Sequence, residues 1–198
     1  MDLVSVSQKI LQEIRNSLEQ ISQEDFAIFS QALKAAPRVF VAGRGRSELM
    51  LKAFAMRLMH LGLEAFVVGE AVTPAMRKGD LLLVASGSGQ TPSLLPLVQK
   101  AREKKAKVAL ITASPESPLA ALSDEVLLIP APSLRTNESG QDKKGLQKAS
   151  RQKAPSLQPL ASLFEQSLLI LLDSIVLRLK EELGVSETQM RQRHANLQ

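Results

Sequence analysis

The sequence predicts an α/β protein, a three-layer αβα sandwich built around a five-stranded parallel sheet. The first observation is a set of five short, almost wholly apolar segments, at residues 38–42, 64–68, 80–85, 107–112 and 125–129. The second is that helical patterns separate most of these segments. Strands that are apolar on both faces are typical of parallel sheets covered by helices on each side. Alternation of strand and helix favours the same architecture, and we expect the strand order 2-1-3-4-5.

Three helices are expected between these strands, at residues 47–61, 92–104 and 118–122. The first of them has apolar residues at helical spacing, which predicts one inward-facing side. The residues expected on that side are Leu49, Phe54, Leu58 and Leu61.

The N-terminal segment is also expected to be helical, because apolar residues recur at i, i+3 and i+4 through residues 3–34. Ser22, followed by acidic residues, indicates a break at which a second helix begins and then ends before Pro37.

The C-terminal segment has a comparable pattern. Pro159 is expected to open a long apolar helix that reaches Leu183, and Ser186 is expected to cap a short last helix that carries His194. The whole chain is then a single domain, residues 1–198. Its expected parts are N-terminal helices (3–36), an αβα core (38–130), a basic loop (131–158) and C-terminal helices (159–195).

The basic loop accounts for most of the net charge. It holds six basic and two acidic residues, a net charge of +4 out of +5 for the chain. A stretch rich in charge, Ser, Gly and Gln is typical of a solvated loop, and we expect it to be mobile and dispensable. The chain has no Trp or Tyr on which bases could stack. We therefore expect no nucleic-acid partner.

Composition also bears on the cellular compartment. The chain has no cysteine, which fits a reducing compartment and excludes disulfides and thiolate chemistry. Its first residues lack the pattern of a signal peptide. The longest apolar stretch, residues 160–179, is interrupted by charged residues and is expected to be a buried helix. We expect a cytoplasmic protein with no membrane partner.

Two turns rich in glycine follow the first and third predicted strands. The first contains Gly45, Arg46 and Ser47, and the second contains Ser86, Gly87, Ser88, Gly89, Gln90 and Thr91. Glycine allows close approach of the backbone to a ligand, and N–H groups at the start of the following helix attract an anion. Together with the hydroxyl groups, these features predict a phosphate site, and two such turns suggest a sugar phosphate held between them.

The placement of the turns supports this interpretation. In the order 2-1-3-4-5 the first and third strands flank the point where the order reverses, which is where ligands bind in such sheets. The first turn lacks the full G-x-G-x-x-G spacing because position 48 is Glu, and no G-K-[ST] sequence for a nucleoside triphosphate is present. The alternative is that both turns are structural strand-to-helix connections.

On these motifs the chain resembles the sugar isomerase (SIS) domain family and, within it, the 6-phospho-3-hexuloisomerases. The resemblance covers nearly the whole chain. It rests on Gly43–Ser47, Ala53–Gly62, Gly69–Pro74, Ser86–Thr91, Leu163–Glu165 and Arg193–Leu197. The chain departs from the family pattern at Glu48, where glycine is usual, at Gln90, where glutamate is frequent, and in the length of the basic loop.

The resemblance implies conversion of 3-hexulose 6-phosphate to fructose 6-phosphate, after fixation of formaldehyde on ribulose 5-phosphate. It also implies a homotetramer and neither a metal nor an organic cofactor. Two alternatives remain: an isomerase of a pentose or heptose phosphate, and a non-catalytic sensor of a sugar phosphate. No basic recognition helix is evident among the N-terminal residues, which favours the enzyme.

Moving a ketone from C3 to C2 requires a group that removes and returns a proton. Glu165 is the expected acid–base residue, because it begins an apolar helix and matches the position of the family's catalytic glutamate. His194 is expected to assist, in its own site or in that of a neighbouring subunit. His60 is expected to be a helix-end or interface residue, and Glu70 and Thr73 are weaker candidates for sugar contacts.

Overall fold

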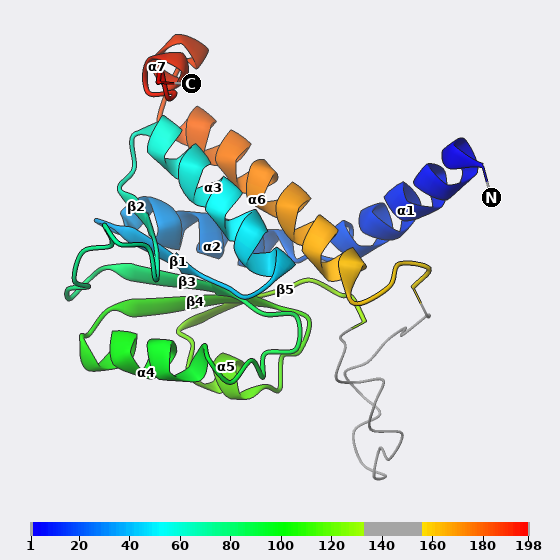
Figure 1. The fold of residues 1–198 in the computed structure, drawn as a ribbon, viewed down its shortest axis with the longest axis horizontal. Helices are drawn as coiled ribbons and strands as arrows, with labels where there is room; N and C mark the ends of the chain where they lie inside the picture. The colour runs from blue at the N-terminus through cyan, green and yellow to red at the C-terminus, as the bar shows by residue number, and fades with distance from the viewer. Residues whose placement is uncertain (1, 133–155, 198) are drawn as a thin grey trace.

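The computed structural model describes residues 2–132 and 156–197 and confirms the predicted architecture (Figure 1). Five parallel strands form one sheet in the order β2-β1-β3-β4-β5. The strands are β1 (Val39–Ala42), β2 (Ala65–Val67), β3 (Leu81–Ala85), β4 (Lys107–Thr112) and β5 (Glu125–Leu128). The helices are α1 (Leu3–Leu18), α2 (Gln23–Ala35), α3 (Arg46–Leu61), α4 (Leu95–Glu103), α5 (Pro118–Ala121), α6 (Ser162–Glu182) and α7 (Glu187–Gln192).

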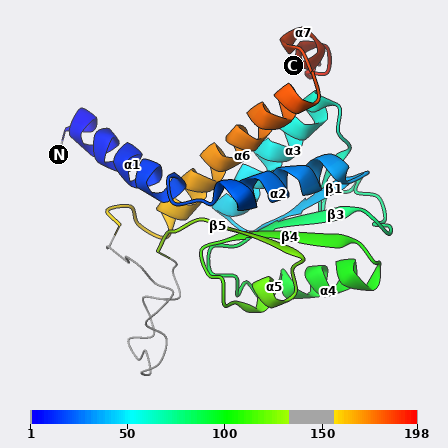
Figure 2. The same ribbon diagram turned by 180° about the vertical axis from the view of Figure 1, so that it is seen from behind.

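Helices cover both faces of the sheet. Figures 1 and 2 show α2, α3 and α6 on one face and α4 with α5 on the other. Side chains alternate between these two layers along each strand. In β1, Val39 and Val41 join the core under α3 and α6, whereas Phe40 and Ala42 join the core above α4. The near-continuous apolar strands therefore reflect burial on two sides, as the sequence predicts.

Ser22 separates α1 from α2, as predicted. Its side chain accepts a hydrogen bond from the Asp25 N–H and caps α2. The Ser186 capping box at α7 is also confirmed, with Gln189 as the reciprocal partner. His194 lies beyond the end of α7, not within it as expected, because this helix stops at Gln192.

Other predicted helix boundaries and faces differ from the structure. The long C-terminal helix begins at Ser162 rather than Pro159, because Leu160 and Ala161 adopt left-handed backbone angles (φ 53° and 63°). α4 begins at Leu95 rather than at residue 92, since the preceding residues form a turn. Leu49 was expected to face inward but is 57% exposed, on the outer side of α3.

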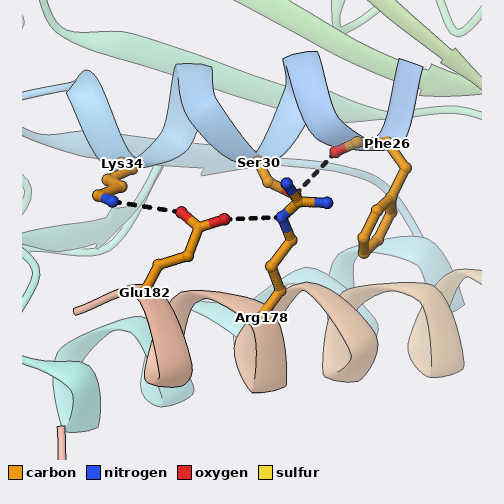
Figure 3. A network of polar contacts seen from close by, with 5 residues as sticks. All are labelled: Phe26, Ser30, Lys34, Arg178 and Glu182. Carbon is orange, nitrogen blue, oxygen red and sulfur yellow. Dashed lines mark hydrogen bonds and ion pairs between the residues drawn. The ribbon is translucent and has the colours of Figure 1, made fainter. Parts of the chain in front are cut away.

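A polar network ties α2 to α6 on the outer side of this layer (Figure 3). Glu182 on α6 accepts from Lys34 of α2 (3.3 Å) and from Arg178 one turn earlier (2.8 Å). The Arg178 guanidinium also lies over the Phe26 ring. These contacts hold α2 across α6, which carries the predicted acid–base residue at its other end.

Helix α1 projects from the body of the molecule (Figures 1 and 2). Glu13 on this helix accepts hydrogen bonds from Ser156 Oγ (2.7 Å), the Leu157 N–H (2.8 Å) and Gln158 Nε2 (2.9 Å). The chain leading into α6 is thus fastened to α1. Most of the basic loop, residues 133–155, lies outside the described residues, so the expectation that it is mobile and dispensable stays a prediction.

Within residues 2–132 and 156–197, no helix combines the length and the apolar character that crossing a membrane requires. Helix α6, which contains most of the longest apolar stretch of the sequence, packs against the sheet, and ten of its residues are buried.

Candidate active site

Both glycine turns and the start of α6 line one pocket of about 250 Å³. It lies beyond the carboxyl ends of β1 and β3, where the sequence placed it. Its lining residues are Arg44, Ser47, Ala85, Ser86, Gly87, Ser88, Thr91, Ala161, Phe164 and Glu165. Six of the predicted site residues (Ser47, Ser86, Gly87, Ser88, Thr91 and Glu165) therefore meet in one place. Four others (Gly45, Arg46, Gly89 and Gln90) belong to the same turns but are not among the lining residues.

The second turn is held tightly by its own hydroxyl groups. Ser86 and Thr91 share a hydrogen bond of 2.9 Å between their side-chain oxygens, and Ser88 Oγ accepts from the Gln90 N–H at 3.3 Å. Gly89 has φ +60°, and a Cβ there would lie 2.0 Å from Ser117 Oγ. Only glycine fits this position, so the turn is fixed in a shape that presents hydroxyls to the pocket.

The first turn opens α3 without a side-chain cap. Gly45 is the N-cap residue and has a backbone conformation (φ 59°, ψ −138°) that side chains disfavour, and no side chain caps the helix. The first N–H groups of α3 therefore lack a capping side chain at the pocket edge. With Ser47 Oγ nearby, this end of α3 suits an anionic group.

Glu165 sits in the first turn of α6, and its side chain is 15% exposed. Its Oε2 atom lies 3.1 Å from the Arg46 NH1, which also donates to Ser162 Oγ at 2.8 Å. The Arg46 contact lacks hydrogen-bond geometry, and Oε2 is buried without a hydrogen-bond donor among the described groups. Burial raises the pKa of Glu165 above its ordinary value, and the positive charge of Arg46 partly opposes this rise.

Packing against the second turn fixes the position of α6. The Phe164 ring, 1% exposed, lies against Gly87, where a Cβ would approach the ring to 3.2 Å. Leu160 and Ala161 hold left-handed backbone angles immediately before α6. Such conformations cost on the order of 1 kcal/mol or more each and are concentrated at functional sites. Together these features aim Glu165 at the glycine turns.

The negative charge of Glu48, one of the departures from the family pattern, is balanced by a nearby lysine. Its carboxylate lies 3.6 Å from Lys52 Nζ, which also contacts Glu70 at 2.8 Å. Its negative charge is therefore shared with a cation one turn along α3. Glu70 is engaged with the same lysine, and Thr73 donates to the Val67 carbonyl, so both weaker candidates make structural contacts rather than lining the pocket.

His194 is not brought to the pocket of its own chain. Its ring stacks on His60 with centroids 5.2 Å apart, at the far end of α3. His60 is 14 residues along α3 from Arg46, which corresponds to about 21 Å of helix. Arg193 donates to the His60 carbonyl at 3.0 Å and holds the C-terminal segment there. His60 is a buried helix-end residue, and burial, Arg57 and His194 lower its pKa.

Four pocket residues were absent from the sequence-based assignment. Ala85 is the last residue of β3 and directly precedes the second turn. Ala161 and Phe164 line the pocket through tertiary packing, which leaves no local signal in the sequence. Arg44 had a signal, because it stands between the two glycines of the first turn. Its Nε donates to Ser93 Oγ (3.1 Å) and its NH1 to the Gly43 carbonyl (2.7 Å).

Comparison with known proteins identifies the family of the chain. The family model of the SIS domain matches residues 32–135. The chain is 38% identical over 190 residues to the 3-hexulose-6-phosphate isomerase of Bacillus subtilis (strain 168), with 96% of each protein covered. It is 36% identical over 197 residues to the enzyme of that name in Mycobacterium gastri, covering all of this chain and 92% of the relative.

A solved structure gives the same result. A Methanococcus jannaschii protein, for which a function as 3-hexulose-6-phosphate isomerase was inferred from its structure, superimposes with a TM-score of 0.76. The match covers 98% of this chain and 97% of that protein at 28% identity. By its sequence match and by its strand order, the chain belongs to the SIS domain family.

Proposed function

We propose that this chain is an isomerase that converts 3-hexulose 6-phosphate to fructose 6-phosphate, in the fixation of formaldehyde on ribulose 5-phosphate. One observation carries the proposal: Glu165, a carboxylate whose pKa is raised by burial, shares a pocket with both glycine turns. The names of the full-length relatives support the choice of substrate.

In this proposal the phosphate of the sugar binds the glycine turns. Ser86, Ser88 and Thr91 supply hydroxyl donors, and Ser47 with the amide groups at the start of α3 supplies the rest. Gly45, Gly87, Gly89 and Gln90 shape the backbone around the phosphate. A phosphate held there leaves C2 and C3 of the sugar to reach toward α6, where Glu165 lies.

Glu165 moves the carbon-bound proton. As a carboxylate it takes the proton from C2, the C–H electron pair forms the C2–C3 double bond, and the C3 carbonyl oxygen receives a proton from solvent to give an enediol. The O2–H bond then breaks and gives its proton to solvent, the ketone forms at C2, and Glu165 returns its proton to C3. Burial favours this role because it raises the pKa of the carboxyl group toward the working range. No metal or organic cofactor is required by these steps.

We also propose a homotetramer in which His194 serves the pocket of a neighbouring subunit, since its own pocket is about 21 Å along α3. The exposed apolar residues on α1 support an assembly: Leu3, Val4 and Leu11 are 83%, 61% and 64% exposed. We propose a cytoplasmic location on the basis of the reaction.

An isomerase assay tests the proposal. Purified chain is mixed with 3-hexulose 6-phosphate and, separately, with pentose and heptose phosphates, and the products are identified by NMR. Turnover that is fastest on the hexulose phosphate supports the assignment. Faster turnover of another ketose phosphate would change the substrate, and binding without any turnover would favour a sensor.

A further inference from the structure

Two arginines of the first turn differ in whether a carboxylate opposes their positive charge. Arg46 lies 3.1 Å from Glu165, so its positive charge is opposed by a carboxylate. Arg44, unlike Arg46, is one of the lining residues, and its contacts are with neutral oxygens, those of Ser93 and Gly43. Among the residues that the structure describes, Arg44 forms no ion pair.

The position of Arg44 follows from the first turn. It stands between Gly43, directly after β1, and Gly45, which has a positive φ of +59°. This turn sends the Arg44 side chain across to Ser93, two residues beyond Thr91 of the second turn. The guanidinium therefore links the first turn to the segment that directly follows the second turn.

The donors of Arg44 are only partly used. Nε and one hydrogen of NH1 are engaged, which leaves NH2 and the second hydrogen of NH1 without partners among the described groups. A guanidinium presents its N–H groups in a planar fork that matches two oxygens of a phosphate.

A sugar phosphate brings between one and two negative charges at neutral pH. Because Glu165 and Arg46 offset one another, hydroxyl and amide groups alone would face that charge if Arg44 were absent. We propose that Arg44 is a phosphate-binding residue of this chain, which reaches from the first glycine turn to the segment after the second and donates charge-assisted hydrogen bonds to the ligand's phosphate. This inference rests on the proposed function only in that the ligand is a phosphorylated sugar.

Calorimetric titration of the full chain with fructose 6-phosphate and with inorganic phosphate tests the proposal. Arg44→Gln should weaken both affinities by about 10-fold or more, the scale of hydrogen bonds to a charged group. Arg44→Lys keeps the charge without the fork and should recover part of the loss. In turnover assays Arg44→Gln should raise KM with little change in kcat.

Arg102→Gln is the matched control. Arg102 also donates to a carbonyl, that of Leu122, and it forms an ion pair with Asp124, at the opposite end of the strands from the pocket. It should leave both affinities unchanged. Arg44→Gln with native affinity for both ligands would overturn the proposal, and so would a native chain that binds neither. If the native chain binds phosphate through Arg44 but does not convert 3-hexulose 6-phosphate, the substrate assignment fails and the role of Arg44 stands.

Discussion

Arg46 and Glu165 join the first glycine turn to the start of α6, with NH1 and Oε2 3.1 Å apart. The pair is more than a structural contact, because burial of Glu165 and the positive charge of Arg46 change the pKa of Glu165 in opposite directions. Burial raises the pKa of Glu165, and Arg46 limits the rise. The arginine therefore keeps the carboxyl group ionised over a wider range of pH than burial alone would allow.

Replacing Arg46 should expose this effect in the pH dependence of activity. A base must be deprotonated to act, so kcat/KM falls on the acid side with the pKa of the free enzyme's base. Arg46→Gln removes the lowering influence, and the acid limb should move to higher pH. Arg46→Lys keeps the charge and should move it less. An acid limb that stays in place in Arg46→Gln would show that Glu165 is not the group being titrated.

The hydroxyls of the second turn should govern affinity rather than chemistry. Ser88→Ala and Thr91→Val each remove a donor to the phosphate, worth about 1.5–3 kcal/mol for a charged acceptor. KM should rise by about 10-fold for each, with the fold retained. Steady-state kinetics checks this, and Ser123→Ala, which removes a hydroxyl bonded to the Leu119 carbonyl, is the control. Unchanged kinetics for Ser86→Ala, Ser88→Ala and Thr91→Val would remove the phosphate site from this turn.

Glu13 should contribute to the free energy of unfolding, because its carboxylate fastens the segment before α6 to α1. Glu13→Ala leaves the donors of Ser156, Leu157 and Gln158 without their acceptor, and Gln158 is 7% exposed. The free energy of unfolding should fall by about 1–3 kcal/mol. Denaturant unfolding measures it, with Glu19→Ala as the control, because the side chain of Glu19, the C-cap residue of the same helix, forms an exposed ion pair with Arg15.

The effect of Glu13 should also depend on pH. Burial raises its pKa, but hydrogen bonds from Leu157, Gln158 and Ser156 outweigh burial and hold it below the ordinary value of 4.5. A depressed pKa gives stability that is present above the unfolded-state value and is lost as pH falls through the folded-state value. The difference between native and Glu13→Ala proteins should therefore shrink below about pH 4. A difference that is constant down to pH 2 would contradict the hydrogen-bonding account.

The fold was predictable because its signals are local. Apolar runs flanked by turns mark the strands, and Ser22 and Ser186 cap α2 and α7 as predicted. The start of α6 was not predictable in the same way. Proline is normally favourable in the first turn of a helix, but the left-handed Leu160 and Ala161 delay α6 by three residues. Tertiary contacts of Phe164 and Glu13 set this geometry, and neither is visible in a local pattern.

In the candidate site, too, some features have a local signal in the sequence and others depend on the tertiary structure. The glycine turns and Glu165 each stand out from their neighbours in the sequence, and the sheet order brings them together. That His194 lies near the C-terminal end of the chain was also evident from the sequence. Its distance from the pocket was not, because that follows from the length of α3 and from the Arg193 contact with the His60 carbonyl.

Assembly of subunits is expected to bring His194 of one subunit to the pocket of another. Light scattering at micromolar concentration should give a tetramer, and Leu11→Lys, on the exposed side of α1, should weaken it. Gln12→Lys adds the same charge at a polar neighbour and should not. His194→Ala should lower activity only in the assembled protein. A monomeric native chain with full activity would leave His194 no route to a pocket.

The central claim is that Glu165 transfers the carbon-bound proton, and exchange with solvent deuterium tests it most directly. In D₂O the native protein should place deuterium on the sugar carbons during isomerisation of 3-hexulose 6-phosphate. Glu165→Gln keeps the size of the side chain but cannot accept the proton, so turnover and deuterium entry should both fall by roughly 100-fold or more, with phosphate affinity unchanged. Near-native exchange in Glu165→Gln, together with its loss in His194→Ala, would contradict the account.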